Sequence, residues 1–106
     1  MKIAITSPNA KTISGHAGKC PGFLLYDIQD NGHMDKTHIK LAKEDVFKNL
    51  AGPLSANPLH PLNSIDVFVT QSLGDGLLSR LQRDNIKVIQ TQETDPETII
   101  KILTYK

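Results

Sequence analysis

Ile65-Asp66-Val67-Phe68-Val69-Thr70 is the stretch that decides the fold. Its β-branched and aromatic side chains are typical of a strand buried in a sheet. The residues after it predict a helix over about 74–84, with leucines at helical spacing, and then a second strand over 86–90. A helix between two successive strands predicts a parallel pair joined by a right-handed crossover.

The rest of the chain extends this unit into one mixed sheet. Three further strands are expected, over residues 2–6, 22–29 and 33–41. Asn31-Gly32 is the signal for a tight turn between the last two. The strand over 22–29 is apolar on both faces, which favours a central place, whereas the weaker alternation over 33–41 is typical of an edge. Asp95 and Pro96 predict the N-cap and first residue of a helix over 95–103. The expected class is α/β, with a five-stranded mixed sheet and flanking helices.

The segment between the two halves is expected to be irregular. Residues 43–50 have the apolar spacing of two helical turns. Prolines at positions 53, 58 and 61 then remove backbone donors and restrict the residues before them. Residues 51–64 are therefore expected to be the least regular part of the domain.

Length and composition limit the class of protein. The chain has 106 residues, 39% of them hydrophobic and 22% charged, and its formal net charge is +1. A near-neutral chain lacks the positive electrostatic potential that attracts a nucleic-acid backbone. Its apolar runs are far shorter than the roughly twenty residues that span a bilayer. One cysteine excludes an internal disulfide. We expect one domain over 1–106, in the cytoplasm, that binds neither nucleic acid nor membrane.

A glycine-rich loop over 14–22 holds the first candidate site. It contains His16, Lys19 and Cys20, the last being the only thiol of the chain. Imidazole and thiolate are ligands for transition metals and iron–sulfur clusters, and a neighbouring lysine favours the thiolate. For such a ligand we expect Cys20 to be exposed, in a loop too rich in glycine to pack a side chain firmly. The alternative is that Cys20 is a small buried hydrophobe and His16 an ordinary polar residue.

The loop over 71–76 is the second candidate, because it follows a strand and begins a helix. Helix N-termini bind anions through unpaired N–H groups, and Gly74 and Gly76 allow close approach here. The alternative is a plain turn, with Ser72 or Asp75 capping the helix. The expected strand order brings this loop beside the His16 loop, at the end of the sheet where α/β proteins bind ligands.

The other polar residues carry weaker signals. His60 is a third candidate metal ligand, or a residue of a surface turn, and His33 and His38 are interpreted as solvated. The sequence spacing does not assemble the strand-associated carboxylates into a divalent-metal site of the kind that hydrolyses phosphodiesters. We therefore expect no enzyme activity. These carboxylates are Asp27, Asp66 and Asp75.

The glycine-rich loop, followed by Phe23 and Tyr26-Asp27, resembles the dinitrogenase iron–molybdenum cofactor biosynthesis family. The second half is similar too, at Asp66–Val69, Leu73-Gly74 and the last helix with its Glu97. The resemblance implies a three-layer ribonuclease-H-like fold without nuclease activity. It also implies binding of iron–sulfur or iron–molybdenum-type clusters or their precursors, with His16 and Cys20 on the loop that the family is thought to use.

Three functions follow as hypotheses. The first is a carrier that binds a preassembled anionic cluster through His16, Lys19, Cys20 and the 74–76 backbone. Its partners would be cluster donor and acceptor proteins, and two copies of the chain could form a homodimer. The second is a regulatory or protein-interaction module without a ligand. The third, less favoured, is a metal-dependent phosphoryl-transfer enzyme.

Overall fold

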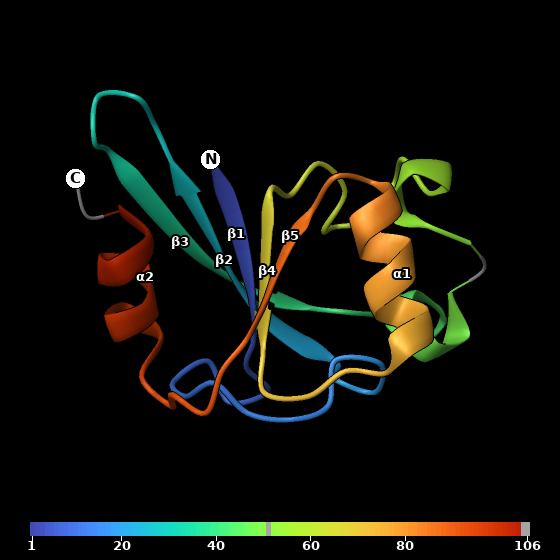
Figure 1. Cartoon of the computed structure of the whole chain (residues 1–106). Helices are drawn as coiled ribbons and strands as arrows, with labels where there is room; N and C mark the ends of the chain where they lie inside the picture. Colours follow the sequence, from blue (N-terminus) through green and yellow to red (C-terminus); the bar gives the residue numbers. More distant parts are fainter. Residues whose placement is uncertain (51, 105–106) are drawn as a thin grey trace.

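The computed structural model describes residues 1–50 and 52–104. A five-stranded sheet runs through the middle of the molecule, in the order β3-β2-β1-β4-β5 (Figure 1). β1 is parallel to β4 and β4 to β5, whereas β2 is antiparallel to both of its neighbours. The strands are β1 Lys2–Thr6, β2 Gly22–Ile28, β3 Met34–Lys40, β4 Val67–Thr70 and β5 Lys87–Gln90. All five expected strands are present, with β2 inside the sheet and β3 at its edge.

Two helices cover the two faces of the sheet. α1 spans Asp75–Arg83 and α2 spans Pro96–Thr104. Figure 1 shows them on opposite sides, which makes three layers. The expected α/β class, with a mixed sheet and flanking helices in a ribonuclease-H-like arrangement, is confirmed.

Alternation along the strands builds a separate apolar core on each face. In β1, Ile3 and Ile5 belong to the core beneath α2, and Ala4 belongs to the core beneath α1. None of the three has exposed surface, because β1 is the central strand. Phe68 extends the α1 core from β4, whereas Tyr26 extends the α2 core from β2.

The N-terminus of α2 is capped as the sequence predicts. Oδ1 of Asp95 accepts the backbone N–H of Glu97 at 3.0 Å, and Oδ2 accepts the hydroxyl of Thr98 at 3.2 Å. Ile99 and Ile100 then turn inward and are buried beneath the helix. Together these residues place α2 against its face of the sheet.

Short 3-10 turns replace regular helices in the middle of the chain. The two turns expected over 43–50 are of this kind, at Lys43–Asp45 and Phe47–Asn49. A third, Leu54–Ala56, is the one helical turn within 52–64, which otherwise contains hydrogen-bonded turns and bends. Residues 52–64 are therefore irregular as expected, and residue 51 lies outside the described residues. They are not the least regular part, because residues 7–21 contain no helical turn and only an isolated bridge at His16.

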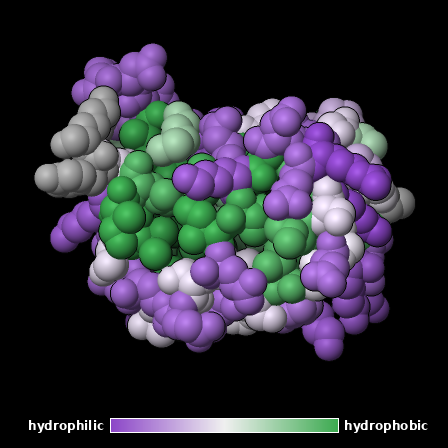
Figure 2. Space-filling view, in the orientation of Figure 1, coloured by the Kyte–Doolittle hydropathy of each residue, from purple (hydrophilic) through white to green (hydrophobic). Residues whose placement is uncertain are grey.

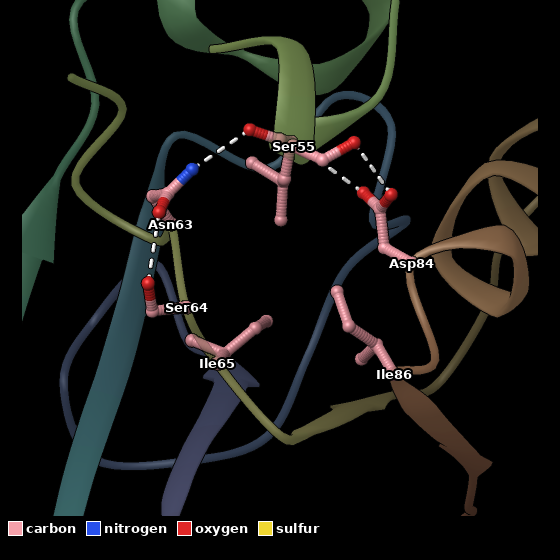
Figure 3. A pocket seen from close by; sticks show the side chains of 7 residues that line it. Ser55, Asn63, Ser64, Ile65, Asp84 and Ile86 are labelled. Carbon is pink, nitrogen blue, oxygen red and sulfur yellow. Dashed lines mark hydrogen bonds between the residues drawn. The ribbon is translucent and has the colours of Figure 1, made fainter. Parts of the chain in front are cut away.

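Hollows among the described residues also lie away from the two candidate loops over 14–22 and 71–76. A pocket of about 190 Å³ opens before β4 and β5, where Asp84 accepts the backbone N–H and the hydroxyl of Ser55 at 3.1 and 2.7 Å (Figure 3). Its polar rim thereby joins the end of α1 to the irregular segment. A broader groove, lined in part by Ile28, Met34 and Leu103, runs between the β2–β3 hairpin and α2.

Apolar side chains also gather on the outer surface of α2 and across the sheet beside it (Figure 2). Within α2, Ile102 is 66% exposed. Among the described residues, no helix is long and apolar enough to cross a membrane.

Candidate functional site

The two candidate loops meet at the carboxyl end of β4. His16 forms an isolated parallel bridge with Ser72, and the backbone N–H of Ala17 donates to the carbonyl oxygen of Ser72 at 2.8 Å. The loop that follows β1 is thus joined to the loop that follows β4. This juxtaposition confirms the expectation from strand order.

The imidazole of His16 is exposed and has one ring nitrogen engaged. Nδ1 lies 2.8 Å from Oγ of Ser72. The other nitrogen, Nε2, has no hydrogen-bond partner among the residues that the structure describes, and it lies beside the backbone of Gly18. One imidazole nitrogen is therefore available to a ligand.

A pocket of about 220 Å³ opens beside this imidazole. Its lining combines glycine backbone, two apolar side chains and two cations. The lining residues are His16, Gly18, Phe47, Lys48, Gly74, Gly76, Leu77 and Arg80.

The charges of this pocket favour an anion. Lys48 and Arg80 both line it, and among the described residues neither forms an ion pair, although Nη1 of Arg80 donates to the carbonyl oxygen of Leu50 at 3.4 Å. The N-terminus of α1 opens into it at Gly74, which caps the helix without a side-chain hydrogen bond. The expectation that Ser72 or Asp75 caps α1 is therefore wrong, since Ser72 uses its hydroxyl on His16. Uncapped N–H groups and the helix dipole both attract negative charge.

Cys20 does not face this pocket, and its expected exposure is wrong. Its side chain is 3% exposed and packs in the α1 core with Ala17 and Phe23. The N–H groups of Lys19 and Cys20 both donate to the carbonyl oxygen of His16 at 3.0 Å, so the loop is a tight turn that directs the thiol inward. Sγ donates to the carbonyl oxygen of Gly22 at 3.0 Å. Burial raises the pKa of this thiol, which disfavours the thiolate form that binds metals.

The glycines of the loop make this packing possible. Gly15 has φ +96°, a conformation that favours glycine, and it lies near Cys20. At Gly22, an added Cβ would lie 3.0 Å from the backbone of both Ser7 and Pro8. Glycine density therefore permits close packing in this loop, contrary to the expectation that it prevents packing.

His60 is also buried rather than placed in a surface turn. Its Nε2 donates to the carbonyl oxygen of Asp45 at 2.8 Å, and its Nδ1 accepts the N–H of Leu62 at 3.0 Å. The ring stacks at an angle on Phe47, with centroids 5.5 Å apart. With both nitrogens engaged, the imidazole has no lone pair left for a metal. His38, expected to be solvated, is half-buried, and its Nε2 donates to the carbonyl oxygen of Ser7 at 3.1 Å.

The structure thus brings together His16, Gly74 and Gly76 among the residues that the sequence singled out. Lys19 is exposed in the turn next to the site but does not line the pocket. Within 1–50 and 52–104, no three histidine, cysteine or carboxylate side chains are grouped as a metal site. The site therefore offers one imidazole and two cationic residues, Lys48 and Arg80, which is not a complete set of ligands for a metal.

Four residues of the pocket escaped the sequence analysis. Arg80 lies three residues after Leu77 and four after Gly76, so helical periodicity could have placed it on the same side of α1 as both. Phe47 and Lys48 come from the irregular segment in the middle of the chain. The backbone N–H of Lys48 donates to the carbonyl oxygen of Gly18 at 2.8 Å, which joins this segment to the His16 loop. No local pattern predicts that contact.

Comparisons with known proteins agree on the family and the fold. The family model described as dinitrogenase iron-molybdenum cofactor matches residues 1–104. No match is found among the curated proteins.

Similar solved structures cover nearly all of the chain. They include a candidate dinitrogenase from Methanocaldococcus jannaschii, at 16% identity and TM-score 0.70, covering 97% of this chain and 86% of that one. A candidate NifB protein from Thermotoga has 16% identity and TM-score 0.63, with the same two coverages. The apo form of the orange protein from Desulfovibrio gigas has 18% identity and TM-score 0.63, covering 96% of this chain and 86% of that one.

Proposed function

The chain belongs to the dinitrogenase iron-molybdenum cofactor family, and from that premise we propose that it is a carrier for a preassembled metal cluster. The cargo class is an anionic iron–sulfur- or iron–molybdenum-type cluster, or a precursor of one. The protein binds this cargo at the His16 pocket, protects it and releases it to an acceptor, without changing its chemistry.

The observation that carries this proposal is the convergence of one free imidazole nitrogen with positive charge at an open pocket. Nε2 of His16 supplies a single ligand to one metal of the cargo. Lys48, Arg80 and the uncapped end of α1 surround it and offset the negative charge of sulfides and bound ligands. Phe47 and Leu77 supply an apolar floor for the sulfide faces.

Incomplete ligation fits a carrier better than a resident cluster site. Resident iron–sulfur clusters are held by about four protein ligands, usually thiolates. This pocket offers one imidazole, and the single thiol of the chain is buried in the core. A cluster that arrives with its own remaining ligands can bind at one point and leave again. Cluster donor and acceptor proteins are the partners that such a role requires.

The test is anaerobic titration with two cargo probes, a synthetic thiolate-ligated [4Fe–4S] cluster and isolated iron–molybdenum cofactor, followed by ultraviolet–visible absorption. We expect the wild-type protein to bind at least one probe. His16→Ala should weaken binding about tenfold or more through loss of the metal bond. His33→Ala is the matched control, because His33 is exposed and pairs with Asp35 away from the pocket.

A second pair of variants tests how much the cationic side chain of Arg80 contributes to the affinity for the cargo. Arg80→Gln should weaken binding about fivefold, equivalent to about 1 kcal/mol for a partly exposed charge, and the loss should shrink at high salt. Arg83→Gln, on the same helix but outside the pocket, should leave affinity unchanged. The ratio of chains to bound cluster shows whether a homodimer shares one cargo. Wild-type protein that binds neither probe would overturn the carrier function and favour an interaction module.

A further inference from the structure

Two buried hydroxyl groups connect the core to the backbone of Ser72, the residue that contacts His16. Oγ1 of Thr6 donates to Oγ1 of Thr70 at 3.1 Å, and Oγ1 of Thr70 donates to the carbonyl oxygen of Ser72 at 3.1 Å. Thr6 and Thr70 have no exposed surface. By the alternation of their strands both lie on the α1 face, the side from which the pocket is built. The backbone of Ser72 is therefore anchored in the core.

The anchored Ser72 holds the His16 loop in two ways. Its carbonyl oxygen accepts the N–H of Ala17, and its Oγ lies 2.8 Å from Nδ1 of His16. That Oγ has no other side-chain or backbone partner among the described residues. It is thus dedicated to the imidazole.

The electrostatics of the pocket decide which partner donates in this hydrogen bond. A neutral imidazole carries its proton on either Nδ1 or Nε2, and a hydroxyl can serve as donor or acceptor. Lys48 and Arg80 line the pocket beside His16. Positive charge attracts a nitrogen lone pair and repels an N–H dipole, so it favours the lone pair on Nε2. The tautomer favoured on this argument has its proton on Nδ1, with Oγ of Ser72 as the acceptor.

We propose that Ser72 is a positioning residue that holds His16 in the Nδ1–H tautomer, so that Nε2 presents its lone pair to the pocket. The inference rests on the proposed function for its purpose, because a lone pair at Nε2 is what a cluster metal requires. A hydrogen bond at the second nitrogen also orients the ring and raises the basicity of the ligating nitrogen. Ser72 acts through His16 and needs no contact with the cargo.

The first test uses the cargo-free protein. Long-range ¹H–¹⁵N correlation spectra of imidazole nitrogens distinguish the two tautomers, and we would record them at about pH 8.5, where a free imidazole is neutral. We expect His16 to be protonated at Nδ1 in the wild type and in Ser72→Thr, which keeps a hydroxyl. In Ser72→Val, which matches threonine in shape but lacks the hydroxyl, Nδ1–H loses its acceptor, and the share of the Nε2–H form should rise above that of the wild type. His33 is the internal reference and should not change.

The second test measures affinity for isolated iron–molybdenum cofactor. Ser72→Val should bind about 10- to 100-fold more weakly than the wild type, and Ser72→Thr should restore most of the affinity. Protonation at Nε2 in the wild type, or an unchanged tautomer in Ser72→Val, would overturn the role of Ser72. Failure of the proposed carrier function alone would give a different result. The tautomer of His16 would still shift in Ser72→Val, but neither the wild type nor any variant would bind the cofactor.

Discussion

At the scale of single residues, the thiol of Cys20 is a packing group. It is buried in the same apolar core as Ala17 and Phe23 and donates to the carbonyl oxygen of Gly22, which also accepts the N–H of Ser7 at 2.9 Å. Cys20→Ala leaves that oxygen satisfied but opens a small void. We expect the free energy of unfolding to fall by about 1–2 kcal/mol.

Chemical denaturation measures this loss, and cofactor titration of the same variant provides the comparison. Binding should be unchanged, and a thiol reagent should modify wild-type Cys20 slowly in the folded protein and fast in urea. A variant as stable as the wild type that no longer binds cofactor would instead identify Cys20 as a ligand.

Gly22 is required by its neighbours rather than by its own backbone angles. A Cβ at this position would lie 3.0 Å from the carbonyl oxygen of Ser7, 3.0 Å from Cα of Pro8 and 3.2 Å from Nε2 of His38. Backbone atoms cannot rotate away as a flexible side chain can. Gly22→Ala should therefore lower the free energy of unfolding by about 1–3 kcal/mol.

The matched control for Gly22→Ala is Gly76→Ala, where the added Cβ meets no atom within 4 Å. Because alanine also favours the helix, this variant should unfold at an unchanged or slightly higher denaturant concentration. Equal stability of the two alanine variants would contradict the steric argument.

At the scale of elements, α2 is joined to the sheet by a buried tyrosine. The hydroxyl of Tyr26 donates to Oε1 of Glu97 at 3.0 Å, and the ammonium of Lys36 lies 3.4 Å from the same oxygen. Burial, and then the nearby Glu97 carboxylate, raise the pKa of Tyr26 well above its usual range. The tyrosine therefore stays neutral in the folded protein at pH values where it ionises in the unfolded chain.

This difference predicts loss of stability in alkali. The contribution of Tyr26 is fully present below about pH 10, the ordinary pKa of tyrosine, and is lost as pH rises toward its raised folded value. The raised pKa of Cys20 acts in the same direction from about pH 8.5 upward. Urea unfolding between pH 7 and 11 should show a steeper decline for the wild type than for Tyr26→Phe or Cys20→Ala. Parallel curves for all three proteins would exclude both groups as the cause.

Elements with a clear hydrophobic pattern were predictable from the sequence. The segment of 3-10 turns in the middle of the chain, which lacks such a pattern, was not. The apolar runs of β1 and β2 reflect burial on both faces, and the run of β2 is why its inner place in the sheet was predictable from sequence. The N-cap of α2 was also predictable, because Asp95 accepts hydrogen bonds from residues only two and three positions further along the chain. The 3-10 turns at 43–45 and 47–49 depend on contacts with distant loops, such as that of Lys48 with Gly18.

At the scale of the whole molecule, topology made half of the site predictable. Strand order alone brings the loop after β1 beside the loop after β4, and His16 and Gly74 therefore meet. Sequence does not encode which side of a turn faces the core. Cys20 and His60 were misjudged for that reason, since each is directed inward by hydrogen bonds to backbone carbonyl groups.

The central sheet separates the two apolar cores, and this division has an evolutionary consequence. The side chains that support the pocket, among them Ala17, Phe47 and Leu77, pack on the α1 side, whereas Ile99 and Ile100 pack on the α2 side. Substitutions that reshape the α2 layer are insulated from the pocket by the strands between them. Descendants of this protein can therefore remodel the α2 surface for new associations while keeping an inherited binding pocket intact.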